Sequence, residues 1–301
     1  MATLDIMLPA AASDELPAIR KITTADLKDA LSKGLADFWA MPTHIFFLGL
    51  IYPVIGLLLG RAAFGYDVIP LLYPLAAGFA LIGPLAAIGL YELSRRREAG
   101  LDTSWRHAFD VFYSPSLKGI VAVGLGLLVL FLVWIAVAQS LYASNFGYAE
   151  PKSWWSFAQD ILTTPQGRSL ILAGNLIGFL FAIVALCVSV VAFPLLLDRN
   201  VGPVTAVLTS VRTVLANPVT MALWGLIVAV LLAAGFATLM LGLAIIVPVL
   251  GHATWHLYRK LVVPDDRPHP FYDRQRKGWH YGAQFPASLF SIYPDDSAKD
   301  R

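Results

Sequence analysis

Two histidines in the last apolar stretch of the chain are its strongest candidates for chemistry. His252 and His256 are four residues apart, so a helix places them one turn apart on the same face. Histidines at this spacing can share a metal ion or stand above a haem. Together with Glu92, which an internal repeat described below aligns with His256, they form the candidate ligand-binding site. The competing interpretation is structural, because both histidines lie within about two turns of a span end, where snorkelling or a hydrogen bond explains them.

Other residue types with reactive chemistry are scarce. The single cysteine, Cys187, lies inside an apolar run, which excludes a disulfide framework and a cysteine-built metal cluster. The chain has no phosphate-binding glycine loop, nucleophile elbow or metalloprotease helix. We therefore predict no catalytic residue, no metal site and no cofactor, and a metal or haem at His252 and His256 is the least expected of the alternatives.

The elements that position these residues must be membrane helices. The chain is 57% apolar and 14% charged, whereas soluble domains have about 45–50% apolar and about 25% charged residues. A water-soluble fold would leave too much apolar surface exposed, so the expected solvent is a bilayer. The 22 basic and 20 acidic residues nearly balance, which gives no indication of a nucleic-acid partner.

Six transmembrane spans are predicted from the apolar runs, because a helix needs about 20 apolar residues to cross the hydrocarbon core. The stretch from Val219 to Val263 would form a straight helix of about 67 Å, twice the core thickness, so we expect it to fold back as two spans with a turn between Gly235 and Gly242. The other four spans are expected at Thr43 to Gly60, Val68 to Tyr91, Leu117 to Leu141, and Leu170 to Leu197.

The distribution of basic residues predicts that both termini are cytoplasmic. With six spans, nineteen of the 22 lysines and arginines lie on one side, and the other side keeps Arg61, Lys152 and Arg168. Cytoplasmic segments near span ends are enriched in these residues. Aromatic side chains near the span ends fit the habit of such rings to lie at headgroup depth. The predicted membrane-interface residues are Phe38, Trp39, Phe112, Trp154, Trp155 and Trp255.

An internal repeat predicts three similar units. Residues 35–42, 108–115 and 211–218 each hold an amphipathic segment that ends in a proline opening a span, with apolar residues three, four and seven positions before the proline. The polar faces of these segments carry Asp37, Asp110 and Arg212. Each unit is then a short cytoplasmic surface helix followed by a transmembrane hairpin. The expected fold is all-α, with three hairpins around a pseudo-threefold axis or along an arc.

The second arms of the hairpins extend the repeat. Residues 84–96 align without gaps on residues 248–260, so that Glu92 corresponds to His256, whereas the middle copy matches only at its basic end, Arg199. The domain organisation expected from these patterns is a polar N-terminal tail at 1–22, a six-helix transmembrane domain at 23–263, and a weakly structured cytoplasmic tail at 264–301.

One family resemblance rests on the segment Gly251-His-Ala-Thr-Trp-His-Leu-Tyr-Arg-Lys260, the pair Asn217-Pro218 and the arrangement of six spans. Over residues 19–263 the chain resembles a proteobacterial integral membrane family, domain of unknown function twenty-one eighty-nine. The resemblance implies a bacterial inner-membrane location and no established activity. Relatives are sometimes labelled as similar to cytochrome c oxidase subunit one. A haem–copper centre needs about six histidine ligands at membrane depth, and only His252 and His256 are available here.

The sequence favours a non-catalytic inner-membrane protein, namely an accessory, scaffold or assembly component with a basic cytoplasmic face. The alternative is a transporter or channel for a small solute or lipid, with Glu92, His252 and His256 at its cytoplasmic mouth. An enzyme is the least expected class. The expected partners are the lipid bilayer and other membrane proteins, and the sequence sets no oligomeric state. A continuous polar cavity would favour transport, and a solidly packed bundle would favour a scaffold.

Overall fold

The computed structural model describes residues 16–41, 69–148, 151, 153–238 and 241–265, and within them every regular element is a helix. The prediction of an all-α fold is confirmed for this part of the chain. The predicted first span, Thr43 to Gly60, lies outside the described residues. The helices are α1 (Thr24–Ala40), α3 (Ile69–Ala86), α4 (Ile88–Glu98), the 3₁₀ helix η1 (Trp105–Tyr113), α5 (Leu117–Phe146), α6 (Trp154–Thr163), α7 (Pro165–Ser189), α8 (Ala192–Asp198), α9 (Pro203–Ala216), α10 (Pro218–Ala237) and α11 (Leu243–Leu261).

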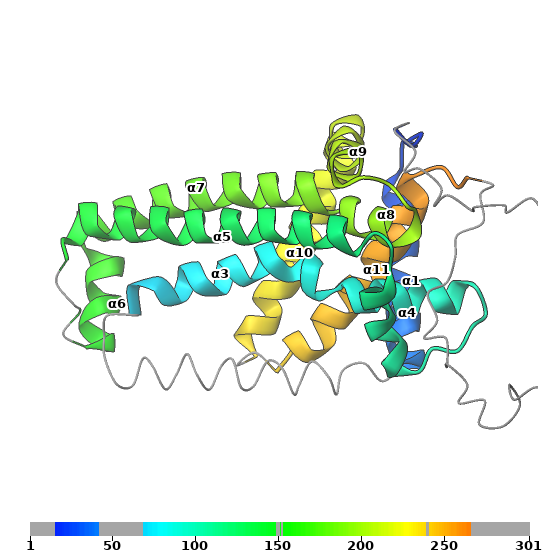
Figure 1. Ribbon diagram of the computed structural model, residues 1–301. Helices are drawn as coiled ribbons and strands as arrows, with labels where there is room; N and C mark the ends of the chain where they lie inside the picture. Colours follow the sequence, from blue (N-terminus) through cyan, green and yellow to red (C-terminus); the bar gives the residue numbers. More distant parts are fainter. Residues whose placement is uncertain (1–15, 42–68, 149–150, 152, 239–240, 266–301) are drawn as a thin grey trace, which may run out of the picture.

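Three helical stretches are long and apolar enough to cross a membrane. They are Leu117–Phe146, Pro165–Asp198 and Pro218–Ala237. Figure 1 shows the first two, α5 and α7 with α8, running side by side along the molecule. Apolar side chains such as Leu125, Leu132 and Leu176 are exposed on their outer faces. A helix that is apolar all round is expected where lipid rather than water surrounds the protein.

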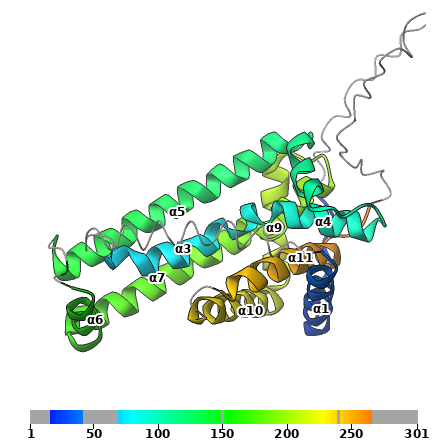
Figure 2. The same cartoon turned by 90° about the horizontal axis from the view of Figure 1, so that it is seen from below.

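The predicted reversal of the last apolar stretch is confirmed. Helix α10 ends at Ala237 and α11 begins at Leu243, so the turn lies between Gly235 and Gly242 as expected. Thr238 stabilises the turn, because its hydroxyl donates to the carbonyl of Gly235 at 2.8 Å and accepts from the backbone N–H of Gly242 at 2.8 Å. The two helices then lie next to each other (Figures 1 and 2).

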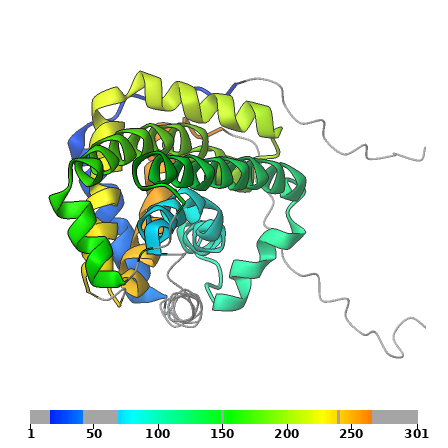
Figure 3. The ribbon, with the colours of Figure 1, turned by 90° about the vertical axis from the view of Figure 1, so that its left-hand side faces the viewer.

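The three segments predicted as surface helices form α1, η1 and α9. Each helix ends two residues before the proline that was expected to close it, and α5 and α10 follow the second and third of these prolines. Helix η1 packs on α4 and α9 packs on α8, which are the helices just before them in the chain. Helix α1 packs on α11, the last helix. In the view along α5 and α7, α9 and α1 lie on different sides of the bundle (Figure 3).

The two ends of the described chain lie together. Ile19 and Val262 form an isolated antiparallel β-bridge, flanked by the bonds Arg20 N to Leu261 O at 2.7 Å and Val263 N to Ala18 O at 2.9 Å. The side chain of Asn217, at the start of α10, accepts from the backbone N–H of Ile22 at 2.9 Å and donates to the carbonyl of Arg20 at 3.0 Å. The last residues of the predicted N-terminal tail are therefore bonded to the helical domain.

Two of the residues assigned to polar helix faces are buried instead. Asp37 is 4% exposed and Asp110 is 6% exposed, whereas Arg212 is exposed as expected. Asp37 pairs with Arg97 of α4 and with His256 of α11, and Asp110 pairs with Arg96 of α4. The spacing of apolar residues along one helix shows which of its faces is polar. It does not show that another helix supplies an arginine at that face, which is what allows the aspartate to be buried.

Candidate functional site

The candidate site lies where α1, α4 and α11 meet. Helix α1 contacts α11 so closely that a Cβ atom on Gly34 would lie 2.6 Å from the backbone nitrogen of Ala253. Asp37 is one turn beyond Gly34, and His252 and His256 flank Ala253, so this contact brings the carboxylate to the histidines.

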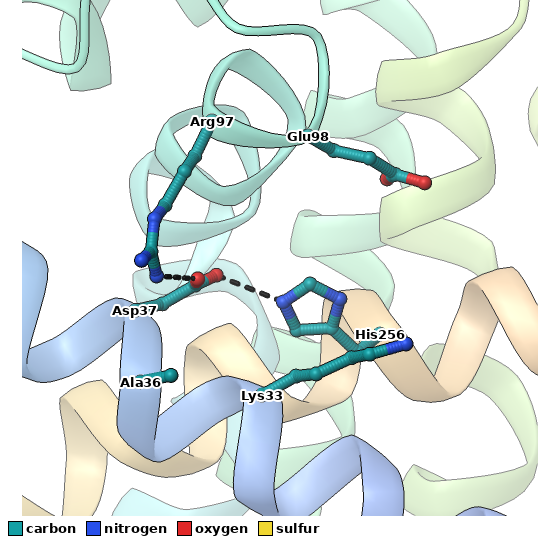
Figure 4. Close-up of a pocket in the computed structure, with 6 residues that line it drawn as sticks. All are labelled: Lys33, Ala36, Asp37, Arg97, Glu98 and His256. Carbon is teal, nitrogen blue, oxygen red and sulfur yellow. Dashed lines mark hydrogen bonds and ion pairs between the residues drawn. The ribbon is translucent and has the colours of Figure 1, made fainter.

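Asp37 is the centre of the site. Its Oδ2 accepts from the Ser94 hydroxyl at 2.5 Å and from His256 Nε2 at 2.9 Å, and its Oδ1 pairs with the Arg97 guanidinium. Figure 4 shows the carboxylate between the Arg97 guanidinium and the His256 ring. Ser94 and Arg97 come from α4, so one carboxylate of α1 joins two other helices.

The proton positions follow from the partners of Ser94. Its Oγ also lies 2.8 Å from His252 Nδ1. A hydroxyl has one proton, and the ionised Asp37 takes it, so His252 Nδ1 must be the donor to Ser94. Both Ser94 and His252 are fully buried.

The combination of serine, histidine and aspartate is not a catalytic triad. In a triad the serine bonds to Nε2 of the histidine and the aspartate accepts from Nδ1. Here Asp37 takes the proton of Ser94 directly, and Ser94 is bonded to Nδ1 of His252. The histidine therefore cannot act as the base for the serine. Among the described residues, no three His, Cys, Asp or Glu side chains lie together as a potential metal site.

The pKa of Asp37 reflects two opposing effects. Burial alone raises it, but the hydrogen bonds from His256 and Ser94 outweigh burial and hold the pKa below the ordinary value of 3.8. The folded state therefore keeps this carboxylate ionised at pH values where the unfolded chain already binds a proton.

This pKa predicts an acid-sensitive contribution to stability. A depressed folded-state pKa stabilises the protein above the unfolded value and loses this effect as the pH falls through the folded value. We expect the difference in unfolding free energy between the wild type and Asp37→Asn to shrink as the pH drops below 3.8. Denaturant titrations in detergent from neutral pH to about pH 3 measure it. A difference that stays constant with pH would contradict the assignment.

Glu92 lies outside this cluster. It accepts from Arg95 Nε at 2.8 Å, and Arg96 lies 4.0 Å away and also pairs with Asp110 of η1 at 3.5 Å. The described structure shows no bond from Glu92 to His252 or His256. Glu92 thus belongs to the α4–η1 junction, whereas His256 belongs to the α11–α1 junction. The structure brings together the two histidines with Asp37, and places the third predicted site residue elsewhere.

Three residues of the cluster were missed by sequence reasoning: Asp37, Ser94 and Arg97. A signal for Asp37 does exist, because it precedes Pro42 by five residues, as Asp110 precedes Pro115. Two acids at the same distance before a proline could have suggested a shared role. Nothing comparable marks Ser94 or Arg97.

A further set of ion pairs joins α11 to α8 and to the end of α4. Tyr258 donates to Asp198 at 2.6 Å, and Arg259 lies 3.7 Å from Asp198 and 3.2 Å from Glu98. Trp255 donates its indole N–H to Glu98 at 3.0 Å and is 1% exposed. Trp255 was predicted at the membrane interface, and the structure places its side chain inside the protein. There Glu98 accepts the indole hydrogen bond that water would accept at an interface.

The other interface residues differ in exposure. Trp39, Phe112, Trp154 and Trp155 are exposed, and Phe38 is buried behind Trp39. Trp39, Phe112 and Leu215, three residues before the three prolines, are 77%, 65% and 71% exposed. Their location in a headgroup layer remains a prediction.

A shallow pocket of about 300 Å³ opens above the Asp37 cluster. It is lined by Lys33, Ala36, Asp37, Arg97, Glu98 and His256 (Figure 4). Its size suits a small polar group, and the Asp37 carboxylate at its floor is already engaged by Arg97 and His256.

A family match covers the middle of the chain. It spans residues 72–198, from α3 to the end of α8, and does not reach Asn217-Pro218 or the segment from Gly251 to Lys260. No curated protein and no solved structure matches the chain. The matched family is described as a predicted integral membrane protein (DUF2189), which is the family expected from the sequence, and the chain is similar to it over residues 72–198.

Proposed function

We propose that the protein is a non-catalytic scaffold or assembly component of the bacterial inner membrane. The observation that carries this proposal is that the ionisable side chains suited to chemistry are bonded to each other across helix junctions. Asp37 engages His256 and Arg97, Asp198 engages Tyr258 and Arg259 at the next junction, and so these groups hold helices together. A scaffold needs such rigid junctions and an accessible face beside them.

Three hairpins in a pseudo-threefold arrangement are the architecture that we propose for this scaffold. In a ring of three units, each surface helix lies on the second arm of the unit before it. The contacts α1–α11, η1–α4 and α9–α8 have this relation. Two close approaches support the same relation. Gly34 of α1 meets Ala253 of α11, and Gly89 of α4 meets Ala108 of η1, where Gly89 and Ala253 are aligned positions of the repeat.

The accessible face would be the cytoplasmic one. Several basic residues are exposed at the end of the molecule that holds α1, α4, α9 and α11, and both ends of the described chain lie there. These exposed residues are Arg20, Lys21, Lys28, Lys33, Arg97, Arg106, Lys118 and Arg212. The positive-inside tendency then supports cytoplasmic termini and a face that attracts anionic lipid or protein surfaces.

Reporter fusions test this orientation. We expect fusions at Arg97, Asn200 and the C-terminus to report a cytoplasmic location and a fusion at Ser153 to report a periplasmic one. The reason is that six spans return the chain to its starting side after each hairpin. A periplasmic C-terminus would remove both the orientation and the three-hairpin arrangement.

Crosslinking in native membranes tests the scaffold function. After crosslinking and affinity purification, wild-type protein should retain a defined set of membrane proteins in near-constant ratio. The double variant Lys118→Glu with Arg212→Glu, which reverses charges on the basic face, should lose that set. Arg168→Glu is the matched control, because Arg168 is an exposed arginine at the opposite end, beside α6.

Retention of the same set by the double variant, or no reproducible set with wild type, would contradict a scaffold that uses this face. The transporter alternative requires a polar path through the bundle. In the described residues, the polar pocket over Asp37 and a second, apolar cavity lie at opposite ends of the molecule, which supports the scaffold.

A further inference from the structure

The second cavity lies at the α6 end of the bundle, between α3, α5, α6 and α7. Its volume is about 370 Å³, within the range of small-molecule sites, which begins at about 300 Å³. Its walls include Tyr73 of α3, Trp134, Ala138 and Tyr142 of α5, Phe157 of α6 and Gly174 of α7. Figure 1 shows α6 across the end of α5 and α7, far from α1 and α11.

The chemistry of the walls favours an apolar occupant. None of the residues that line the cavity is charged. Three of its polar side chains already have partners: Tyr73 donates to Asn175 at 2.7 Å, Asn175 donates to the carbonyl of Ile171 at 2.8 Å, and Trp134 donates to the carbonyl of Pro74 at 2.9 Å. A bound water needs two to four polar partners, so these walls suit hydrocarbon better than water or an ion.

The surroundings of the cavity supply that hydrocarbon. Two of its walls are α5 and α7, which are long enough to cross a membrane and expose leucines on their outer faces. Tyr73, at the rim, is 64% exposed, so the cavity is continuous with the lipid-facing surface. Trp154 and Trp155 are exposed on α6 beside it. With these tryptophans at the headgroup depth predicted for them, the cavity would lie just inside the hydrocarbon boundary.

Free space is present on the α7 side. A Cβ atom on Gly174 would meet no atom within 4 Å. An empty space of this size loses dispersion contacts on all its walls, and a neighbouring lipid chain restores them. We propose that the cavity binds one acyl chain of a phospholipid from the surrounding leaflet. This site is independent of the scaffold function and of the Asp37 cluster.

Photolabelling with a lipid tests the proposal. The full chain is reconstituted in phosphatidylethanolamine vesicles that contain a phospholipid with a diazirine in the middle of one acyl chain, and labelled peptides are identified by mass spectrometry. We expect label on Tyr142. This side chain is 8% exposed, so a lipid that stays outside the cavity does not reach it. Label on the exposed Leu132 of the same helix provides the internal reference.

Gly174→Leu is the test variant, because its side chain would enter the free space. We expect the label on Tyr142 to fall about tenfold relative to the label on Leu132. A tenfold loss of lipid affinity is expected when about two methylene groups of the acyl chain are no longer buried. Gly126→Leu is the matched control. Gly126 is exposed on α5, and a Cβ atom there also meets no atom within 4 Å, so its labelling should equal that of wild type.

Ala138→Leu fills the same space from α5 and should lower the label in the same way, which keeps the test valid if one variant folds poorly. Helical circular dichroism and the thermal midpoint check the fold of each variant. Tyr142 without label in wild type, or equal label in Gly174→Leu and wild type, would overturn the proposal. A higher thermal midpoint of Gly174→Leu without any loss of label would do so as well, because it would show that the leucine fills space the lipid does not use.

Discussion

Asp37→Ala is expected to lower the free energy of unfolding by about 3–5 kcal/mol, the usual cost of removing one partner from a buried ion pair. The carboxylate accepts from Ser94 and His256 and pairs with Arg97, and its exposed fraction is 4%. Alanine would leave the hydroxyl of Ser94 in a fully buried place without the carboxylate that accepts its proton. Denaturant titration of the purified protein in detergent, followed by helical circular dichroism, measures the change.

The control for this variant is Asp29→Ala on the same helix. Asp29 pairs with Lys33 at 3.0 Å and Lys260 at 2.9 Å, but its side chain is 40% exposed. Exposed ion pairs contribute about 1 kcal/mol or less. Equal destabilisation by the two variants would show that Asp37 does not hold the α1–α4–α11 junction.

Gly34→Ala is expected to separate α1 from α11. The added Cβ would lie 2.6 Å from both the Cβ and the backbone nitrogen of Ala253, and backbone cannot move aside without displacing the helix. Overpacking of this kind costs about 1–3 kcal/mol, occasionally more. The lost contact should also expose α1 to protease, because the bonds of Asp37 to α4 and α11 depend on the same close approach.

The matched control makes the same chemical change in open space. Gly174→Ala on α7 adds a methyl group that meets nothing within 4 Å, and alanine in place of glycine favours a helix by up to about 1 kcal/mol. We expect this control to keep or raise stability. Similar losses in the two variants would attribute the effect of Gly34→Ala to something other than its contact with Ala253.

The features that follow from local pattern could be predicted from the sequence. The turn near Thr238 follows from the length of an apolar run that no single span can use. The ends of α1, η1 and α9 follow from the prolines at 42, 115 and 218, since the residue before a proline is disfavoured in a helical conformation. Each of these inferences uses one continuous stretch of the chain, where sequence and helix geometry are directly linked.

The features that depend on distant partners could not be predicted. Asp37 and His256 are 219 positions apart in the chain, and nothing in either neighbourhood indicates that they bond. Asp37 therefore looks like a residue of a solvated helix face, although it is buried. Trp255 looks interfacial for the same reason, because its partner Glu98 lies 157 positions away.

Glu92 illustrates a different limit. Residues that align in a repeat occupy corresponding places in separate units, so the alignment of Glu92 with His256 is not evidence that they touch. Each is found at its own helix junction, with Arg95 and Arg96 around Glu92 and with Asp37 beside His256. The described structure shows no bond between Glu92 and His256.

The pairing of the chain's first described residues with its last helix has a consequence for biosynthesis. His256 comes 219 positions after Asp37, so until the ribosome has made that stretch α1 has no α11 to pack against and the Asp37 carboxylate has no His256. At about 5–20 residues per second this wait is roughly 10–40 s. We expect α1 to wait at the membrane surface in the meantime, where its exposed Trp39 would offer an anchor. Any product that stops short of α11 keeps an unmatched amphipathic helix, a form that quality-control proteases can distinguish from the finished protein.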